Sequence, residues 1–321
     1  MDPHARTRSD SEGRNLMIPI DLVTGVTPLH AAPRLALRLG LGAGDLLVKR
    51  DDLIGLGGGG NKVRKLQYTC AEAIGGSATV LVTTGAPQSN HARLTAAAAA
   101  RLGLRAVLVL EGAEPPQVQG NLLLEKYLGA SVVWAGDDDL AAAAAGVVAA
   151  LAADGERPYL IPFGGTSAHS AEGYADAARE LLGQLPEPDH VVVAVGSGGT
   201  MAGLVKVLGA KRVLGVDCGA VDDARGTVAD LLRGMGSAVA PEELRIDGNQ
   251  IGRGYARLEP ATRAAMTEFA QAEGILLDPT YTGRAGAGLI SAVRSGEIRP
   301  GERTVFLHTG GLPGLFGHPE A

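Results

Sequence analysis

Short β-branched apolar runs alternate along this chain with segments of helical periodicity, and this alternation constrains the fold more than any other feature. Continuous apolar runs separated by helices are typical of parallel strands covered on both faces. The sequence therefore predicts an α/β protein with parallel-rich, twisted sheets covered by helices. The predicted strands are Leu46–Lys49, Thr79–Thr83, Ala106–Leu110, Ser131–Trp134, Tyr159–Ile161, Val191–Val195, Val213–Val216 and Thr304–Leu307. The predicted helices are Lys62–Ile74, Asn90–Leu102, Val118–Leu128, Leu140–Ala153, Ala168–Leu182, Thr200–Leu208, Pro260–Glu273 and Gly283–Val293.

Glycine clusters near 55–60 and at 164–165 indicate two possible hinges, because glycine imposes few limits on the backbone. The sequence predicts a flexible polar tail over residues 1–16. It then predicts a large domain formed by residues 17–57 together with 165–321, and a small domain over 58–164 inserted into it.

Composition excludes several classes of protein. Of the 321 residues, 45% are hydrophobic and 20% are charged. This balance permits a sizeable core. The net charge of -6, without a basic stripe, argues against nucleic-acid binding. The most apolar run, Leu140–Ala153, is shorter than the roughly 20 residues of a bilayer span and is typical of a helix capped by the acidic residues at 137–139. We expect a cytoplasmic protein without a signal peptide, and the distant Cys70 and Cys218 predict neither a disulfide framework nor a metal site.

Two glycine loops indicate the chemistry. The first presents Lys62 after Gly58, Gly59, Gly60 and Asn61. The second, Gly196–Thr200, follows a predicted strand and opens a helix, where backbone N–H groups and the helix dipole favour a phosphate. It matches neither the dinucleotide fingerprint nor a Walker A loop, so it suits a monophosphate. A cofactor with an aldehyde at one end and a phosphate at the other would use both loops, and pyridoxal 5'-phosphate is that cofactor. A tight turn that binds nothing is the alternative for the second loop.

Lys62 is expected at the start of a helix, with Asn61 as its N-cap. A cation at a helix N-terminus opposes the dipole, so the position lowers the pKa of the lysine and favours the neutral amine that Schiff-base chemistry needs. An ordinary solvated lysine is the alternative. Arg64 and Lys65 in the same helix are expected to be ordinary surface or ion-pair residues.

A third polar segment, Thr84–His91, also follows a strand and precedes a helix. Ser89 and Asn90 are good N-cap residues, so capping alone would account for them. In a functional interpretation, the first helical turn holds a substrate carboxylate and Ser89 passes a proton. Ligands bind at the carboxyl ends of strands in open α/β sheets, so we expect the clusters at 83–85, 196–198 and 308–311 to converge on one site.

Taken together, these segments make the chain similar to the D-cysteine desulfhydrase and 1-aminocyclopropane-1-carboxylate (ACC) deaminase family. This family consists of pyridoxal phosphate enzymes with the tryptophan synthase β fold, called fold type II. The resemblance also implies a homodimer. The matching segments run from residue 48 to 311 and are Val48–Leu53, Gly59–Leu66, Gln88–Arg93, Gly196–Thr200, Leu277–Gly283 and His308–Gly311.

The resemblance implies a role for each matching residue. Lys62 forms the Schiff base with the cofactor, and Asn90 hydrogen-bonds its phenolic oxygen. Ser89 receives the substrate carboxylate, together with backbone groups near Asn90 and His91. Thr309 faces the pyridine nitrogen. Tyr281 and Tyr255 line the substrate site, although ordinary packing would also account for the two tyrosines. The expected catalytic residues are thus Lys62, Ser89 and Tyr281, and the expected phosphate ligands are Gly196, Ser197, Gly198, Gly199 and Thr200.

Two positions favour one activity within the resembled family. ACC deaminases have Glu where this chain has Thr282, and they lack Thr at the position of Thr309. A hydroxyl beside the pyridine nitrogen leaves it largely neutral, and this weaker electron sink suffices when an α-proton and a good β-leaving group depart. The resemblance thus implies α,β-elimination on a small amino acid, with D-cysteine as the first substrate. The alternatives are L-cysteate, another β-substituted alanine, or ACC, and, in a different class, a non-catalytic sensor of a phosphate ligand.

Three features depart from the pattern of the resembled family and leave the substrate open. The loop before Lys62 is richer in glycine. Thr280 stands where Val is usual, and Leu312-Pro313-Gly314 stands where Ala-Pro-Ala is common.

Overall fold

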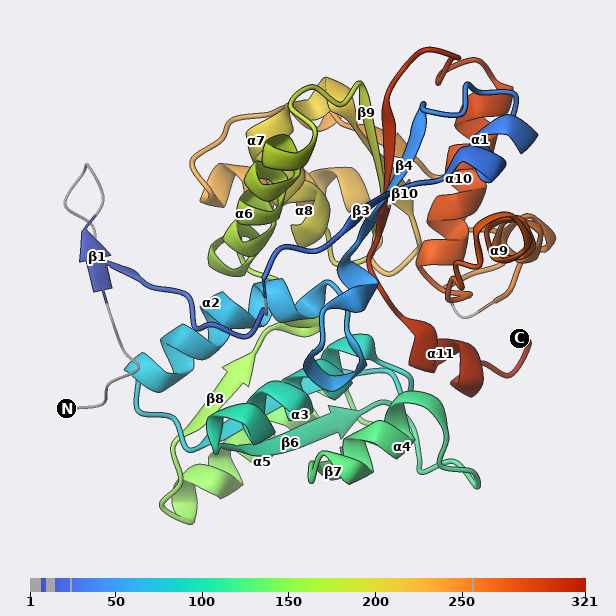
Figure 1. Ribbon diagram of the computed structural model, residues 1–321. Helices are drawn as coiled ribbons and strands as arrows, with labels where there is room; N and C mark the ends of the chain where they lie inside the picture. Colours follow the sequence, from blue (N-terminus) through green and yellow to red (C-terminus); the bar gives the residue numbers. More distant parts are fainter. Residues whose placement is uncertain (1–6, 10–14, 24, 256) are drawn as a thin grey trace.

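The computed structural model describes residues 7–9, 15–23, 25–255 and 257–321, and its strands form two main sheets (Figure 1). The larger sheet has six strands in the order β11-β10-β9-β12-β4-β3, and all neighbours are parallel except β3 and β4. Its strands are β3 Leu29–Ala31, β4 Leu46–Arg50, β9 His190–Val195, β10 Val213–Asp217, β11 Arg245–Asp247 and β12 Thr304–His308. The expectation of parallel-rich sheets is confirmed.

The smaller sheet has four parallel strands in the order β7-β6-β5-β8. They are β5 Val80–Gly85, β6 Arg105–Leu110, β7 Ser131–Trp134 and β8 Pro158–Ile161. All four lie within the segment 58–164 that was expected to form an inserted domain; the division into domains itself stays a prediction. Of the predicted tail 1–16, Thr7–Ser9 (β1) pairs antiparallel with Asn15–Met17 (β2), and the other tail residues lie outside the described part.

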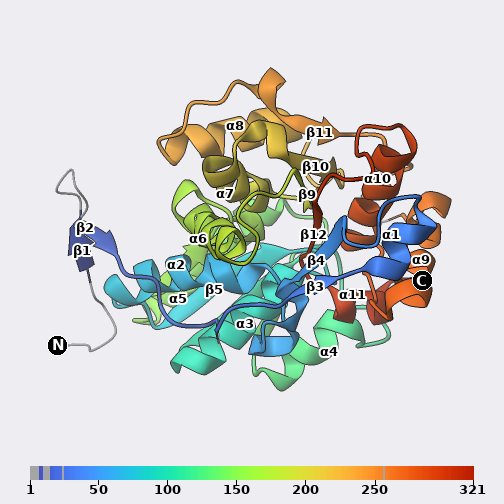
Figure 2. The same ribbon diagram turned by 45° about the horizontal axis from the view of Figure 1, so that its top comes forward.

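Helices cover both faces of the larger sheet, which explains why its strands are continuous apolar runs. Alternate residues of β9 point to opposite faces: Val191, Val193 and Val195 pack with α6, α7 and α8, whereas Val192 and Ala194 pack with α1, α9 and α10. Figure 2 shows these two groups of helices on either side of the sheet. The helices are α1 Pro33–Arg38, α6 Ala168–Gln184, α7 Gly199–Leu208, α8 Ala224–Gly234, α9 Pro260–Glu273 and α10 Thr282–Arg294.

The smaller sheet is also covered on both faces. Leu81 and Leu108 pack with α2 and α3, whereas Val82 and Val109 pack with α5. Helix α2 contacts α3 on one side and α6 on the other, so it lies between the two sheets (Figure 1). The remaining helices are α2 Lys62–Gly75, α3 Asn90–Leu102, α4 Gly120–Tyr127, α5 Leu140–Ala153 and α11 Leu312–Gly317.

Helix caps agree with the sequence in one place and differ in another. Asp139 caps α5 by accepting a hydrogen bond from the backbone N–H of Ala142, as expected. Asn61 does not cap α2, so that expectation is wrong: its backbone is helical, and its side-chain amide instead donates to Thr200 Oγ1 at 3.0 Å. Cys70 and Cys218 are both free and buried. Among the described residues, the helices are all too short or too polar to cross a membrane.

Candidate active site between the two sheets

A cavity of about 210 Å³ opens where strands of both sheets reach their carboxyl ends. The three polar clusters that follow β5, β9 and β12 all contribute to its lining, as the strand-end argument predicted. The lining also includes residues that follow three other strands: Glu111 after β6, Phe163 and Gly164 after β8, and Gly219 after β10. Of the sequence-predicted residues, the cavity brings together Lys62, Ser89, Asn90, His91, Gly196, Ser197, Gly198, Thr200, Tyr255, Tyr281 and Thr309. Gly199 is buried behind the wall, as the first residue of α7.

Lys62 is the first residue of α2, and its Nζ donates a hydrogen bond to the carbonyl oxygen of Gly164 at 2.9 Å. Burial lowers the pKa of the amine from 10.5 to about 8, because the charged form loses its solvation. The sequence predicted a lowered pKa from the helix dipole, and the structure supplies a different cause, desolvation. A larger fraction of neutral amine is therefore present near neutral pH than for a solvated lysine.

Lys65 was expected to be an ordinary surface or ion-pair residue, and this expectation is wrong. Its side chain is buried, its Nζ donates to Thr166 Oγ1 at 2.9 Å, and burial lowers its pKa well below the usual value. A Cβ added to Gly199 would lie 3.0 Å from this Nζ, so the amine rests against the second glycine loop. The signal was present in the sequence, because a spacing of three residues puts Lys62 and Lys65 on one helix face.

The second glycine loop has the form of an anion cradle. Gly198 adopts a left-handed φ of 81° just before α7, and no described side chain caps the first-turn N–H groups of that helix. Uncapped N–H groups of this kind are free to bind a ligand. Two hydroxyls flank the loop: Ser197 Oγ lies 2.6 Å from Thr166 Oγ1, and Thr200 Oγ1 accepts from Asn61. Backbone donors, the Lys65 amine and hydroxyls are the groups that hold a phosphate.

Ser89 caps α3, because its Oγ accepts a hydrogen bond from the backbone N–H of Ala92 at 3.1 Å. Asn90 Oδ1 accepts from Asn121 Nδ2 at 3.1 Å, which fixes the amide at the cavity wall. His91 is buried beside Thr83, with 2.9 Å between Nε2 and the hydroxyl. Burial and the nearby lysines lower the pKa of His91 well below 6.5, so the ring is neutral.

Tyr255 and Tyr281 contact one another in the lining of the cavity. Their hydroxyls are hydrogen-bonded, and their rings meet edge to face with centroids 5.8 Å apart. Burial raises the pKa of Tyr255 to about 12 and that of Tyr281 well above 10, so both hydroxyls keep their protons. Arg284 fixes the Tyr255 segment by donating to its carbonyl oxygen at 3.0 Å.

Thr309 and Thr282, the two residues that favoured D-cysteine in the sequence, differ in whether they reach the cavity. Thr309 lines the cavity, and its carbonyl oxygen accepts a hydrogen bond from the backbone N–H of Asn61 at 2.9 Å. Thr282 does not line the cavity. It is buried and its hydroxyl donates to Asp278 Oδ1 at 2.6 Å, so any influence on the reaction would be indirect.

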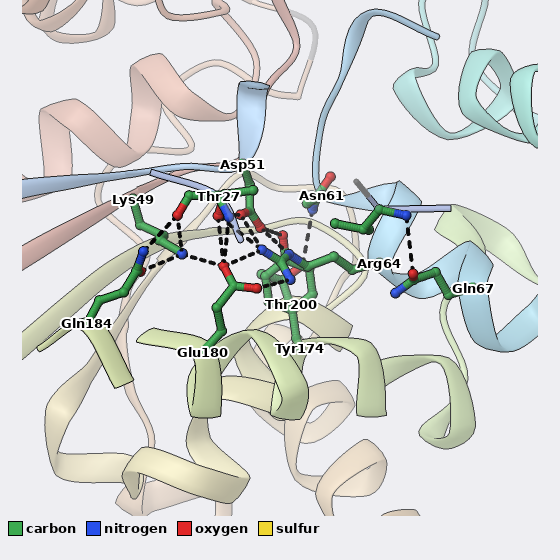
Figure 3. Close-up of polar contacts among 11 residues, drawn as sticks. Thr27, Lys49, Asp51, Asn61, Arg64, Gln67, Tyr174, Glu180, Gln184 and Thr200 are labelled. Carbon is green, nitrogen blue, oxygen red and sulfur yellow. Dashed lines mark hydrogen bonds and ion pairs between the residues drawn. The ribbon is translucent and has the colours of Figure 1, made fainter. Parts of the chain in front are cut away.

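Helix α2 is anchored by a buried cluster of charges (Figure 3). Arg64 donates to both carboxylate oxygens of Asp51 at 2.9 Å and to both of Glu180 at 3.0 Å. Tyr174 adds a hydrogen bond to Asp51, and Lys49 forms an ion pair with Glu180 at 2.5 Å. Burial would raise the pKa of Glu180, but hydrogen bonds and charges from Arg64 and Lys49 lower it to about 2. The expectation for Arg64 is thus confirmed as an ion pair and wrong as a surface residue.

These residues fit pyridoxal phosphate. A buried amine with a lowered pKa, that of Lys62, lines the cavity together with a glycine cradle that has the second buried amine, that of Lys65, beside it. A side chain at Gly164 or Gly199 would meet Ser197, Lys65 or Thr166, so glycine is needed at both positions. Fold and site together define an enzyme class in which a lysine binds a phosphorylated aldehyde.

The comparisons with known proteins agree with that class. The chain belongs to the family described as pyridoxal-phosphate dependent enzymes, whose sequence model matches residues 20–310. A protein of Pyrococcus abyssi named "Putative 1-aminocyclopropane-1-carboxylate deaminase" is 39% identical, with 94% of each chain covered. The D-cysteine desulfhydrase of Klebsiella pneumoniae is 38% identical, covering 94% of this chain and 96% of that one.

Comparison with solved structures indicates the same family and fold. One described as an ACC deaminase homologue superposes with a TM-score of 0.84 at 35% identity, covering 94% of each chain. The threonine deaminase isoform 2 of Solanum lycopersicum, at 19% identity and a TM-score of 0.64, covers 90% of this chain and 80% of that one and shares the fold. The chain is therefore a pyridoxal phosphate-dependent enzyme of fold type II, within the lyase group formed by D-cysteine desulfhydrases and ACC deaminases.

Proposed function

We propose that this enzyme catalyses α,β-elimination from D-cysteine, giving hydrogen sulfide, pyruvate and ammonia with the uptake of one water. The observation that supports elimination is the buried Lys62 amine in a cavity that also contains the glycine cradle. The observation that favours D-cysteine over ACC is the presence of Thr309 in the cavity wall, at the position that faces the pyridine nitrogen in the resembled family.

The cofactor, when bound, supplies an electron sink for the charge left on the substrate α-carbon. Residues of the chain bind the substrate and move the proton. The first turn of α3, with Ser89 and the N–H groups near Asn90 and His91, binds the substrate carboxylate. Lys62 Nζ, neutral in part because it is buried, accepts the α-proton. Ser89 Oγ can relay that proton, since its bond to Ala92 uses only its acceptor function.

The leaving group departs toward the tyrosine pair in this proposal. Tyr255 and Tyr281 are protonated at all physiological pH values, so a hydroxyl can donate a proton or a hydrogen bond to the departing hydrosulfide. The cradle residues from Gly196 to Thr200, together with Lys65, hold the phosphate. Asn90 contacts the ring oxygen of the cofactor.

The first test is the visible absorbance of the purified protein before and after borohydride reduction. We expect a yellow band that reduction abolishes, with the adduct on Lys62. Lys62→Ala should lack the reducible band, whereas Lys211→Ala, which removes an exposed lysine, should retain it. A protein that stays colourless with added pyridoxal phosphate, or a Lys62→Ala variant with full function, would favour the sensor instead.

The second test compares the release of a 2-oxo acid from D-cysteine, L-cysteate and ACC, with sulfide measured in parallel. Pyruvate and sulfide from D-cysteine at the highest kcat/KM support the proposal. Faster pyruvate release from L-cysteate would identify the alternative lyase, and 2-oxobutanoate from ACC would identify a deaminase. A homodimer and a cytoplasmic location stay predictions, and light scattering coupled to size exclusion measures the first.

A further inference from the structure

A second cavity, of about 450 Å³, adjoins the catalytic one. We call it the outer pocket. The two cavities share Ala86, Asn90, Tyr255 and Tyr281, so the tyrosine pair and the start of α3 form the boundary between them. The rest of the outer wall comes from the loops before α3, α4 and α10 and from α11 with the residues after it. It includes Pro115, Pro116, Gln117, Thr280, Gly314 and Pro319.

The walls of the outer pocket are largely uncharged. Prolines supply apolar surface, and Gln88, Gln117 and Gln119 supply neutral amides. Asp278 is the carboxylate of the wall, but four donors already saturate it: the N–H groups of Thr280, Tyr281 and Thr282 and the Thr282 hydroxyl. Such a wall matches an uncharged group with both apolar surface and hydrogen-bonding capacity.

The basic side chain in this wall is His318. Its Nδ1 accepts a hydrogen bond from the backbone N–H of Glu320 at 3.1 Å. Among the described residues that line the outer pocket there is no lysine or arginine, so the wall has no permanent cation for the sulfonate of L-cysteate.

The outer pocket also contains two of the positions that depart from the family pattern. Thr280 and Gly314 both line it, and neither lines the catalytic cavity. A Cβ added to Gly314 would have its nearest neighbour, Asn121 Nδ2, 3.9 Å away, so the glycine leaves open space rather than relieving a clash.

We propose that the outer pocket is the subsite for a bulky, uncharged β-substituent, and that the enzyme acts on S-substituted cysteines. The inference rests on the proposed function. The catalytic cavity of about 210 Å³ must hold both cofactor and amino acid, so a larger substituent has to extend past Tyr255 and Tyr281 into the outer pocket. Lys62 takes the α-proton, and the Cβ–S bond breaks with its electron pair moving to sulfur. The sulfur takes up a proton and leaves as a thiol, and one water converts the remainder to pyruvate and ammonia.

The experiment compares S-benzyl-D-cysteine with D-cysteine on the holoenzyme. We expect pyruvate from both, with benzyl thiol released in equal amount from the first. Gly314→Leu fills the outer pocket and should lower kcat/KM for the benzyl compound about tenfold relative to that for D-cysteine, because the apolar ring loses its burial. Gly44→Leu, at an exposed glycine with no heavy atom within 4 Å, is the matched control and should leave the ratio unchanged.

Calorimetric titration of S-benzyl-D-cysteine separates this inference from the proposed function. If D-cysteine yields no pyruvate but Gly314→Leu weakens binding of the benzyl compound, the proposed function fails and the subsite stands. If wild type turns over D-cysteine but not the benzyl compound, or if Gly314→Leu changes neither the kinetic ratio nor the binding, the subsite is overturned.

Discussion

Lys62 and Lys65 stand three residues apart at the start of α2, and burial lowers the pKa of both amines. The ordinary lysine pKa of 10.5 would leave almost no neutral amine at pH 7, whereas the Lys62 pKa of about 8 leaves about a tenth of it neutral. The two amines therefore have different roles. Lys62 supplies the reactive amine, and Lys65 stands beside the glycine loop, where a bound phosphate would favour its charged form.

The lowered pKa of Lys62 predicts how cofactor uptake depends on pH. The rate at which the apoprotein takes up pyridoxal phosphate should rise with pH and level off above about 8, because the neutral amine is the attacking form. Stopped-flow absorbance between about pH 6 and the ordinary lysine pKa measures this rate. Free Nα-acetyl-lysine is the reference, and its rate should keep rising over the whole range. The same profile for the protein and the free amino acid would contradict the prediction.

Glu125 on α4 offers a second residue-scale prediction. The carboxyl is fully buried, neither oxygen has a hydrogen-bond partner among the described residues, and burial raises its pKa from 4.5 to about 8. The folded state thus holds a proton that the unfolded state releases between these pH values. Stability should fall as pH rises through that window, by about 1 kcal/mol per pH unit.

Glu125→Gln removes this titration. Urea unfolding at two pH values within that window should show a smaller loss of stability for the variant than for wild type, and the difference between them should grow with pH. Glu242→Gln, at an exposed position, should keep the wild-type slope. A Glu125→Gln slope that matches wild type would mean that Glu125 is ionised in the folded protein.

At the scale of elements, the buried charge cluster fixes α2, and thereby Lys62, between the sheets. Removing one partner of a buried pair leaves an uncompensated charge, which costs about 3–5 kcal/mol. We expect Arg64→Met to lower the free energy of unfolding by that amount, because Asp51 would lose its cationic partner and Glu180 would keep only Lys49. Denaturant unfolding at neutral pH measures it. Arg233→Met is the control, because the Arg233–Asp230 pair is largely exposed. An exposed pair of this kind contributes about 0.5 kcal/mol at most.

Long elements with a regular sequence pattern were predicted correctly from the sequence, whereas several short or irregular elements were not. The longer elements were located to within about two residues, because eight or more residues of clear periodicity define a helix and continuous apolar runs define buried strands. The helices α1 and α11 and the edge strands β3 and β11 were missed. Six residues are less than two turns of a helix, and three residues are too few for a strand pattern. Helix α8 was missed as well, because two glycines weaken its pattern and its stability comes from packing on the larger sheet.

At the scale of the whole molecule, the strand-end rule predicted the site correctly within each sheet. Each polar cluster after β5, β9 and β12 does reach the cavity. The rule could not predict how the two sheets face each other. Contacts that cross from one to the other, such as Asn61 to Thr200, were therefore beyond it. Lys65 was misjudged for the same reason, because its surroundings include α6 packed against α2 and Gly199 at the start of α7.

Cofactor removal tests this arrangement in solution. The cavity is lined by strand ends of both sheets, so pyridoxal phosphate binds only the folded chain. A ligand at about 100-fold its Kd stabilises that state by about 2.7 kcal/mol. The holoenzyme should therefore have a Tm about 5 °C above that of the apoenzyme. Added pyridoxal phosphate should restore the difference, and pyridoxal without the phosphate should restore less of it, since the cradle at α7 would stay empty. Equal recovery with both compounds would place the phosphate outside the cradle, and equal Tm values for apoenzyme and holoenzyme would mean that the cofactor does not hold the two sheets together.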